Sequence, residues 1–177
     1  MSTRSVTRVM DNGTELVCIY RQCDGYPSGM GADLKRILKG YRIVNGISGN
    51  DGNCAKCKEP RYMHRGRQAK TGEQSHRFVP CRVANGMGCM AASLVKALKD
   101  GVGNIYLYAA GVKDAGQRYE YTLWVEGNAD NNYAHNCGPL MLKVSIPEFN
   151  DADEKVSEKV LWSGALDKYT PRDNNEL

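Results

Sequence analysis

Hydrophobic and polar positions alternate along the chain in short blocks, and the spacing within each block predicts its secondary structure. Blocks with a period of two, or rich in β-branched and aromatic residues, favour strands. The strands predicted in this way lie at residues 15–21, directly after the turn signal Asn12-Gly13, then at 41–44 as a short strand, and at 105–110, 119–126 and 140–146.

Other blocks repeat their apolar residues at the helical spacing. In residues 32–39 three apolar residues stand at i, i+3 and i+4, and Gly40 follows as a natural C-terminal cap. Residues 89–99 form a second apolar stripe that ends before Gly101. Near the end of the chain, residues 156–166 predict a short helix.

Together these elements predict an α+β fold, in which a mostly antiparallel sheet of four to five strands carries two main helices on one face. We expect a single domain over residues 1–150. Residues 45–80 lack apolar periodicity and are expected to form a long inserted loop that is basic and carries cysteines. Residues 151–177 are expected to form an acidic C-terminal tail.

The net charge of +4 over 177 residues conceals a strong asymmetry. Residues 56–82 contain eight Lys or Arg and two acids, whereas residues 113–177 contain seven Lys or Arg and twelve acids. A basic segment is typical of proteins that bind phosphates, nucleic acid or an acidic partner. The alternative is a solvated loop without a partner.

The sequence also limits the compartment and the chemistry of the cysteines. No apolar stretch is as long as a membrane span, and residues 1–13 lack the apolar core of a signal peptide. We therefore expect a cytoplasmic protein with no membrane partner, and a homo-oligomer stays open. Seven cysteines make a complete disulfide framework improbable in that compartment and favour reduced thiols or a metal site.

A candidate zinc site lies in the basic segment. Cys54 and Cys57 form a Cys-x-x-Cys pair, which can hold zinc when two further ligands are supplied. The preferred set adds Cys81 and either His76 or Cys89. A metal would order a polar segment that has no core of its own. Free cysteines in a mobile loop are the alternative.

A glycine-rich loop joins the predicted strand at 15–21 to the predicted helix at 32–39. Exposed amides in such a loop, at the positive end of a helix, favour anions. The loop lacks the lysine of a P-loop and the third glycine of a dinucleotide fingerprint. The candidate ligand-binding residues are Asp24, Gly25, Tyr26, Ser28, Gly29, Gly31, Lys35 and Arg36. The alternative is a tight turn in which Asp24 caps amides and Tyr26 packs on the sheet.

A second Gly-Met-Gly turn precedes the helix at 89–99. Its glycines, Gly86 and Gly88, match Gly29 and Gly31, and both turns lead into helices that end at glycine. The similarity is consistent with an internal duplication or with chance. If the turns share one pocket, Gly86 and Gly88 join the candidate ligand site.

The stretch Asp24-Gly25-Tyr26-Pro27-x-Gly29-x-Gly31 resembles a group of short proteins from phages and mobile elements. In that group a strand leads into Asp-Gly-Tyr-Pro-x-Gly-x-Gly and then into a Leu-rich helix. The later Ile-Tyr-Leu-Tyr strand is similar to that group as well. The resemblance implies a viral or mobile-element accessory protein that acts in the cytoplasm of the host cell.

Two further features suggest chemistry. Tyr106 and Tyr108 stand two apart in a predicted strand and would share one face, where they can stack bases or fill the core. His135 and Cys137, with Asp130, form a weak nucleophile-and-base pattern in a polar loop.

The function we predict first is the sequestration of a phosphate-bearing nucleotide signal, without catalysis, as a counter-defence accessory protein. One alternative is a zinc-stabilised module that binds nucleic acid or protein through residues 56–82. A second alternative is an enzyme that degrades the nucleotide, with Asp24 or His135 involved. The sequence favours binding over catalysis because no established catalytic motif is present.

Overall fold

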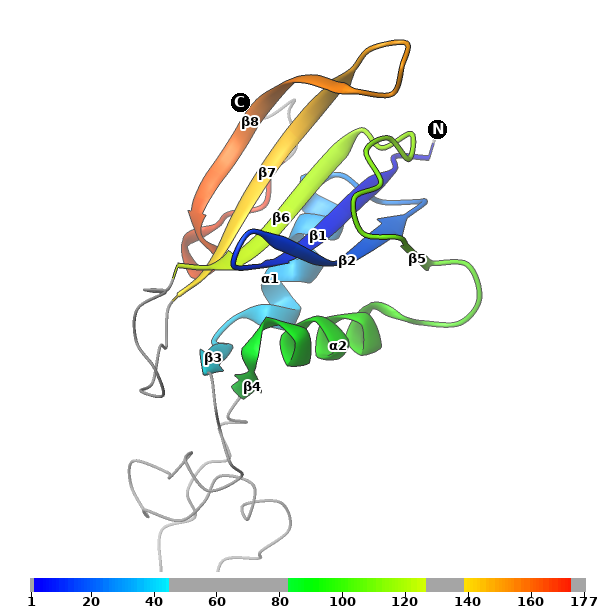
Figure 1. The fold of residues 1–177 in the computed structure, drawn as a ribbon. Helices are drawn as coiled ribbons and strands as arrows, with labels where there is room; N and C mark the ends of the chain where they lie inside the picture. Colours follow the sequence, from blue (N-terminus) through cyan, green and yellow to red (C-terminus); the bar gives the residue numbers. More distant parts are fainter. Residues whose placement is uncertain (1, 45–82, 127–138, 173–177) are drawn as a thin grey trace, which may run out of the picture.

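The computed structural model describes residues 2–44, 83–126 and 139–172 of the chain. Within these ranges the chain has an α+β fold, with one six-stranded sheet, one two-stranded sheet and two α-helices (Figure 1). In chain order the elements are β1 (Ser5–Asp11), β2 (Thr14–Arg21), a π-helical turn η1 (Pro27–Gly31), α1 (Ala32–Leu38), β3 (Arg42–Val44), β4 (Val83–Asn85), α2 (Gly86–Leu98), β5 (Ile105–Tyr108), β6 (Tyr119–Val125), β7 (Leu140–Phe149), β8 (Lys155–Ala165) and a 3₁₀ turn η3 (Leu166–Lys168).

The main sheet has the strand order β5-β2-β1-β6-β7-β8. Every neighbouring pair is antiparallel except β1 and β6, which run parallel in the middle of the sheet. The α+β class and the mostly antiparallel pairing are therefore as predicted, but the sheet has one strand more than the predicted four to five. A separate parallel pair, β3 and β4, lies beside the helices.

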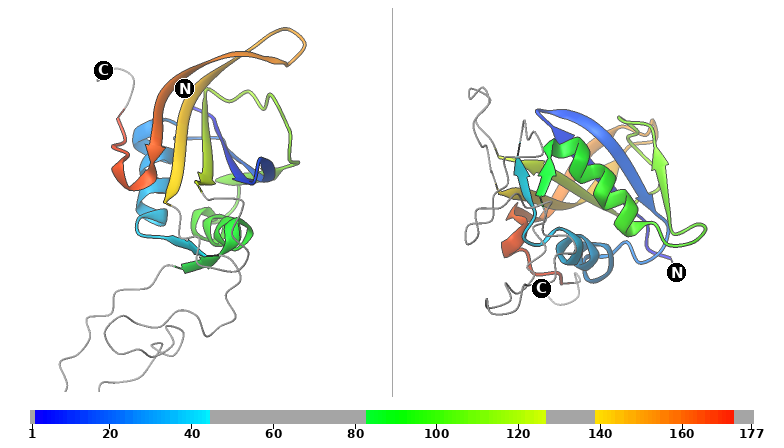
Figure 2. Two further views of the ribbon diagram at one scale, coloured as in Figure 1. Left: turned by 60° about the vertical axis from the view of Figure 1, so that its left-hand side comes forward. Right: turned by 90° about the horizontal axis from the view of Figure 1, so that it is seen from below.

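The hydrophobic core lies between the main sheet and the two helices. From the sheet, Ile19, Tyr121, Leu123 and Leu142 are completely buried, and they belong to one cluster with side chains of α1 and α2. The helix residues at the centre of this cluster are Leu34, Leu38, Met90 and Leu94. Viewed from below, α2 crosses β1 and β2 on the same side of the sheet as α1 (Figure 2). Both helices thus cover one face, as expected.

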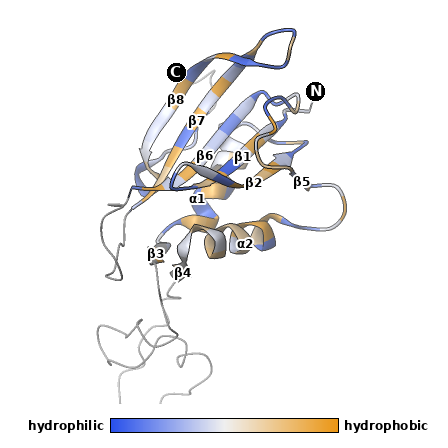
Figure 3. Cartoon of the chain, viewed as in Figure 1, coloured by the Kyte–Doolittle hydropathy of each residue, from blue (hydrophilic) through white to orange (hydrophobic). Residues whose placement is uncertain are grey.

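The strands alternate between this buried face and the opposite one, which we call the helix-free face. In β7, Leu142 and Val144 belong to the core cluster, whereas Lys143 forms an ion pair outside it. Hydrophobic and hydrophilic colours alternate along this strand in Figure 3. The alternation follows from the period of two along a strand. As a result, each strand contributes apolar side chains to the core on one face and polar side chains to the helix-free face on the other.

The predicted short helix at residues 156–166 is wrong, because most of this segment is the edge strand β8. Its backbone pairs antiparallel with β7 from Lys155 to Ala165. Two of its apolar residues, Val156 and Val160, are exposed, at 61% and 49%, so they form no buried helical stripe. Pairing with β7 determines the structure here, and it brings residues 155–165 of the predicted tail into the main sheet.

Strand β1 was not predicted, although its turn was recognised. Asn12 and Gly13 both have positive φ, at 47° and 80°, which is the conformation of a two-residue hairpin turn. In β1, Ser5 and Thr7 are as buried as Val6 and Val9. Because Ser5 and Thr7 put polar residues on the same buried side of the strand as Val9, no clean alternation of apolar and polar positions was visible.

None of the helices among the described residues has the length and apolar character that crossing a membrane requires.

Candidate functional site

The glycine-rich loop after β2 packs tightly against β1. The Gly25 amide donates a hydrogen bond to the Thr3 carbonyl at 2.9 Å, and the hydroxyl of Tyr121 donates to the Gly25 carbonyl at 2.9 Å. A Cβ atom at Gly25 would lie 2.7 Å from the backbone nitrogen of Ser5. Glycine at this position therefore permits a close approach of two backbone segments.

Two further amides of this loop are also hydrogen-bonded within the protein. The Gly29 amide donates to the Tyr26 carbonyl, and the Met30 amide donates to the Asp24 carbonyl, each at 2.9 Å. A Cβ atom at Gly31 would lie 2.5 Å from the hydroxyl oxygen of Tyr169. These contacts give the glycines a packing role and use amides that an anion cradle would need to present to a ligand.

The polar side chains of the predicted site are likewise engaged. The Tyr26 hydroxyl donates to an Asp24 carboxylate oxygen at 3.2 Å. Lys35 donates to the backbone carbonyl of Tyr169, which ties α1 to the end of η3. Arg36 forms an ion pair with Asp33 at 2.8 Å. Ser28 lies within η1, between Pro27 and Gly31.

Asp33 forms ion pairs with two arginines, and the one with Arg21 holds α1 against β2. It accepts from Arg21 at 2.6 Å as well as from Arg36. Burial opposes ionisation of Asp33, but the hydrogen bonds from Arg36 and Arg21 outweigh this effect and lower its pKa. Of the two cations predicted to bind a phosphate, Lys35 and Arg36, Arg36 is thus already paired with the Asp33 carboxylate.

The two Gly-Met-Gly turns lie at opposite ends of α1. Gly31 directly precedes α1, whereas Gly86 follows β4, which pairs with β3 beyond the other end of α1 (Figure 1). Both methionines, Met30 and Met87, are buried in the core cluster. Gly88 has no atom within 4 Å of an added Cβ. The structure does not bring the two turns together.

The predicted zinc ligands Cys54, Cys57, His76 and Cys81 lie outside the described residues, as do Asp130, His135 and Cys137. Of the alternatives, Cys89 is exposed on α2. No group of three or more metal-ligating side chains occurs in the ranges that the structure describes. The zinc site therefore stays a prediction.

An aromatic cluster at one end of the main sheet is the feature that the structure brings together most clearly. Tyr106 and Tyr108 on edge strand β5 share the helix-free face with Tyr20 on β2. The Tyr20 and Tyr108 rings are stacked, with centroids 5.1 Å apart and planes 7° apart, and the Tyr106 ring is tilted against Tyr20 at 6.1 Å. We call these three residues the tyrosine cluster.

The three residues of the tyrosine cluster differ in how far their side chains are exposed. Tyr20 is only 8% exposed, whereas Tyr106 is 44% and Tyr108 is 38% exposed. Strand β5 ends the sheet, so the side of the Tyr108 ring that faces away from Tyr20 lies beyond the last strand. The Tyr20–Tyr108 stack can accordingly be continued by a further flat ring.

Arg4 and Arg118 directly precede the adjacent strands β1 and β6. Strand β1 lies next to β2, which carries Tyr20, and β6 is one strand further from the tyrosine cluster. Ser5 is in register with both Arg21 and Tyr119, so Arg4 and Arg118, each one residue earlier, lie beside one another. The Arg118 amide donates to the Arg4 carbonyl at 3.0 Å. Both side chains are exposed, and neither forms an ion pair with the part of the chain that the structure describes.

Arg4 also acts on the cluster electrostatically. Burial raises the pKa of the Tyr20 hydroxyl, and the positive charge of Arg4 opposes that rise. A cation beside exposed aromatic rings is the combination that binds the phosphate and base of a nucleotide.

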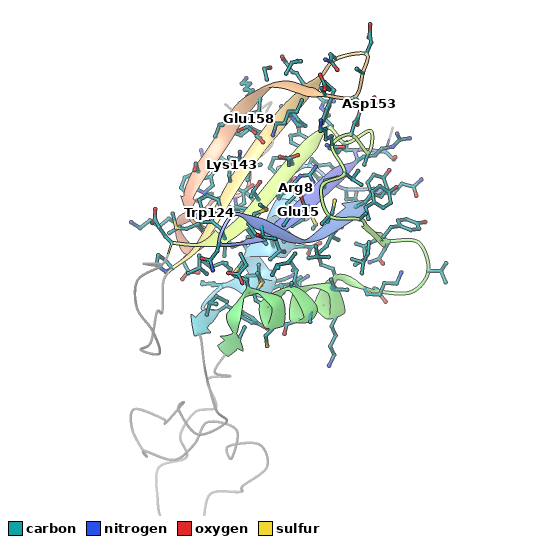
Figure 4. All side chains as sticks on the ribbon, viewed as in Figure 1. Arg8, Glu15, Trp124, Lys143, Asp153 and Glu158 are labelled. Carbon is teal, nitrogen blue, oxygen red and sulfur yellow. The ribbon has the colours of Figure 1, made fainter. Side chains whose placement is uncertain are left out.

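The rest of the helix-free face carries a chain of alternating charges, which we call the charge ladder (Figure 4). It runs from β2 to the β7–β8 hairpin through ion pairs of 2.6 to 3.1 Å, in the order Glu15, Arg8, Glu120, Lys155, Glu158 and Lys143. Ser145 adds its hydroxyl to Glu158 at 3.1 Å. Because each member faces an opposite charge, the ladder serves to hold the strands together.

The charge ladder also fixes the loop between β5 and β6. Arg8 donates to the Val112 carbonyl at 2.6 Å, and beneath it Cys18 is completely buried. Burial raises the pKa of the Cys18 thiol to about 11, so this cysteine is a neutral core residue. The ladder was missed in the sequence because its members lie on five strands that no local pattern connects.

Comparisons of this chain with protein-family models, with curated proteins and with solved structures found no match.

Proposed function

We propose that this protein binds a nucleobase-bearing ligand, with the base stacked on the exposed tyrosines of β5. The observation that carries the proposal is the Tyr20–Tyr108 stack at 5.1 Å and 7°, whose outer ring is 38% exposed at the edge of the sheet. Base stacking on an aromatic side chain contributes about 1–3 kcal/mol per base. Tyr106, on the same face of β5, offers a second ring.

The charges beside the tyrosine cluster support the same class of ligand. Arg4 and Arg118 are exposed and adjacent, whereas the arginine of the charge ladder, Arg8, is partnered by Glu15 and Glu120. The Arg118 guanidinium lies over the Tyr119 ring, 5.9 Å from its centroid, and neither arginine is paired with a carboxylate of the described residues. Guanidinium groups without a carboxylate partner favour phosphate. The predicted sequestration of a nucleotide thus keeps its ligand class but moves from the glycine-rich loop to the tyrosine cluster.

The test uses two variants of the same strand. Tyr108→Ala removes the outer ring of the stack, and Leu107→Ala removes an apolar side chain that is 57% exposed on the opposite face of β5. Binding of a panel of nucleotides and short oligonucleotides is measured by calorimetry. We expect Tyr108→Ala to weaken binding at least tenfold, or about 1.4 kcal/mol, with Leu107→Ala unchanged.

Two results decide against the proposal. Equal binding by Tyr108→Ala and the unsubstituted protein would show that the base lies elsewhere, and the glycine-rich loop would then be the next candidate. Absence of binding across the whole panel would remove nucleotides as ligands. Chromatography of the ligand after incubation distinguishes capture from degradation.

A further inference from the structure

We infer that the protein forms a weak symmetric dimer, in which the edge strands β5 of two copies pair antiparallel and join the two main sheets into one. The inference goes beyond the proposed function and does not depend on it. It follows from the difference between the two edge strands of the main sheet, β5 and β8.

The β8 edge carries the features by which natural proteins keep an open strand from pairing with another chain. Three charged residues stand along it, Lys155, Glu158 and Lys159, and its pairing with β7 is interrupted twice by a shift of register. Charges and bulges on an edge strand oppose the addition of a further strand. We therefore expect β8 to stay the end of the sheet.

The β5 edge lacks these features. Residues 101–112 contain no charged residue and no proline, and β5 pairs with β2 without a shift of register. Within the described part of the chain, no strand pairs with the outer side of β5. Apolar side chains are exposed on both of its faces, with Tyr106 and Tyr108 on the helix-free face and Leu107, 57% exposed, on the other. An uncharged apolar edge of this kind favours the addition of a strand.

A second copy of β5 fits this edge on both faces. Two identical antiparallel strands are related by a two-fold axis perpendicular to the sheet, so each face of one copy continues the same face of the other. Pairing centred on Leu107 places this residue opposite its counterpart, and Tyr106 opposite Tyr108 of the second copy. A register shifted by one residue is excluded, because residues that lie opposite each other must share a face. The register centred on Leu107 pairs all three exposed side chains with one another.

The inner side of β5 shows that this strand accepts such a neighbour. Tyr20 of β2 lies opposite Tyr106 on the helix-free face. On the other face, Ile19 lies opposite Leu107. A second β5 presents the outer side with the same alternation of an aromatic and an aliphatic residue. A partner segment with charged side chains would have to desolvate them against a neutral edge, whereas a second copy has none to desolvate there.

The dimer is expected to be transient, because a strand of four residues gives an interface at the small end of the specific range. Tyr106 of the second copy would lie on the side of Tyr108 that the stack with Tyr20 leaves open. A base and a second copy therefore compete for this ring. Nucleotide titrations at low protein concentration, where the chain is monomeric, are not affected by the competition.

Analytical ultracentrifugation over a wide range of protein concentration measures the dimer. We expect the sedimentation coefficient of the unsubstituted protein to rise with concentration. Leu107→Lys places like charges opposite each other at the two-fold axis and should weaken dimerisation at least tenfold. Val160→Lys is the matched control, because Val160 is an apolar residue of the other edge strand, β8, and is 49% exposed. It should leave dimerisation unchanged.

A mixture of two variants tests the pairing itself. Leu107→Glu alone should dimerise as weakly as Leu107→Lys. Equal amounts of the two variants should dimerise within about threefold of the unsubstituted protein, because opposite charges then face each other across the axis. A variant that had lost its fold could not recover in this way, and circular dichroism of each variant checks the fold directly.

The outcomes separate this inference from the proposed function. A chain that stays monomeric at every concentration overturns the dimer and leaves the proposed function as it is. Dimerisation that is weakened by Val160→Lys but not by Leu107→Lys also overturns it, because β8 is then the interface. A mixture that stays monomeric overturns the pairing centred on Leu107. Dimerisation that is lost in Leu107→Lys, with no nucleotide bound by any form, supports the dimer and overturns the proposed function.

Discussion

Glu120 and Arg8 form an ion pair of 3.1 Å across the parallel strands β1 and β6, with side chains only 5% and 12% exposed. This pair is the centre of the charge ladder. Lys155 binds the other oxygen of Glu120 at 2.9 Å and so connects the β7–β8 hairpin to the middle of the sheet. A single buried carboxylate therefore links three parts of the fold.

Removing that carboxylate charge should destabilise the protein strongly. Glu120→Gln leaves the Arg8 guanidinium with Glu15 as its remaining anion and weakens the contact with Lys155, and we expect a loss of about 1.5–3 kcal/mol from these charge-assisted hydrogen bonds. Urea denaturation measures the free energy of unfolding. The control is Glu154→Gln, since Glu154 and Lys113 are 4.0 Å apart and both more than 60% exposed. An exposed pair contributes at most about 1 kcal/mol. Equal effects of the two substitutions would contradict the structural role of the ladder.

The stability of the protein should fall in acid because of Glu158. Burial opposes ionisation of this residue, but hydrogen bonds from Lys143 and Lys155 outweigh burial and lower its pKa from 4.5 to about 2. A carboxylate with a depressed folded-state pKa adds stability above its unfolded-state pKa. That contribution is present above pH 4.5 and is lost as the pH falls toward 2.

The measurement is the free energy of unfolding of the unsubstituted protein and of Glu158→Gln between neutral pH and the acid limit. We expect the two curves to be apart at neutral pH and to converge in acid, because the variant lacks the group that titrates. Curves that stay parallel over the whole range would show that Glu158 is not the source of the acid sensitivity.

Two glycines of the candidate site should respond oppositely to alanine. At Gly25 a Cβ atom meets the backbone of Arg4 and Ser5 at 2.7 Å, so Gly25→Ala should destabilise by about 1–3 kcal/mol. Gly88 lies in α2 with open space around it, so Gly88→Ala should stabilise by about 0.5–1 kcal/mol. Thermal unfolding compares them. A neutral Gly25→Ala would mean that the loop does not press on β1 in solution.

The contributions of the Tyr108 hydroxyl and of the Tyr108 ring to ligand binding can be measured separately. Tyr108→Phe keeps the stack with Tyr20, so we expect it to bind oligonucleotides within about threefold of the unsubstituted protein, unlike Tyr108→Ala. Calorimetry with the same panel of nucleotides and short oligonucleotides measures this. If the Phe variant binds as weakly as the Ala variant, the hydroxyl and not the ring provides the contact.

The predicted zinc site is tested by elemental analysis of the purified protein. We expect stoichiometric zinc, lost in Cys54→Ser together with Cys57→Ser but retained in Cys23→Ser, whose cysteine is exposed after β2 and outside the predicted set. Protein without zinc, with thermal stability unchanged by a chelator, would favour free thiols in the basic segment.

The sequence predicted those elements whose structure depends on residues close together in the chain, and it failed where the structure depends on contacts between distant segments. The helices α1 and α2 and the strands β2, β5, β6 and β7 were recognised from spacing within each segment, because one face of each is buried. Strand β8 was mistaken for a helix, since its conformation comes from pairing with β7 rather than from its own pattern.

For the candidate site the same division holds. The shared face of Tyr106 and Tyr108 could be predicted, because two residues of one strand are separated by one period. Their stacking partner Tyr20 and the neighbouring Arg4 could not, because both come from strands that are distant in the sequence. The glycines of the loop after β2 were read as a cradle, whereas contacts with β1 and Tyr169 explain Gly25 and Gly31.

The parallel pairing of β1 with β6 has a consequence for synthesis. The ribosome completes the β1–β2 hairpin first, but β6 follows about a hundred residues later. At a synthesis rate of about 5–20 residues per second, the inner edge of β1 waits roughly 5–20 seconds for its partner. During that interval Arg8 lacks Glu120, and an open strand edge is a site for wrong pairing. The edge of β1 in the nascent chain is therefore open to wrong pairing until β6 joins it at the centre of the sheet.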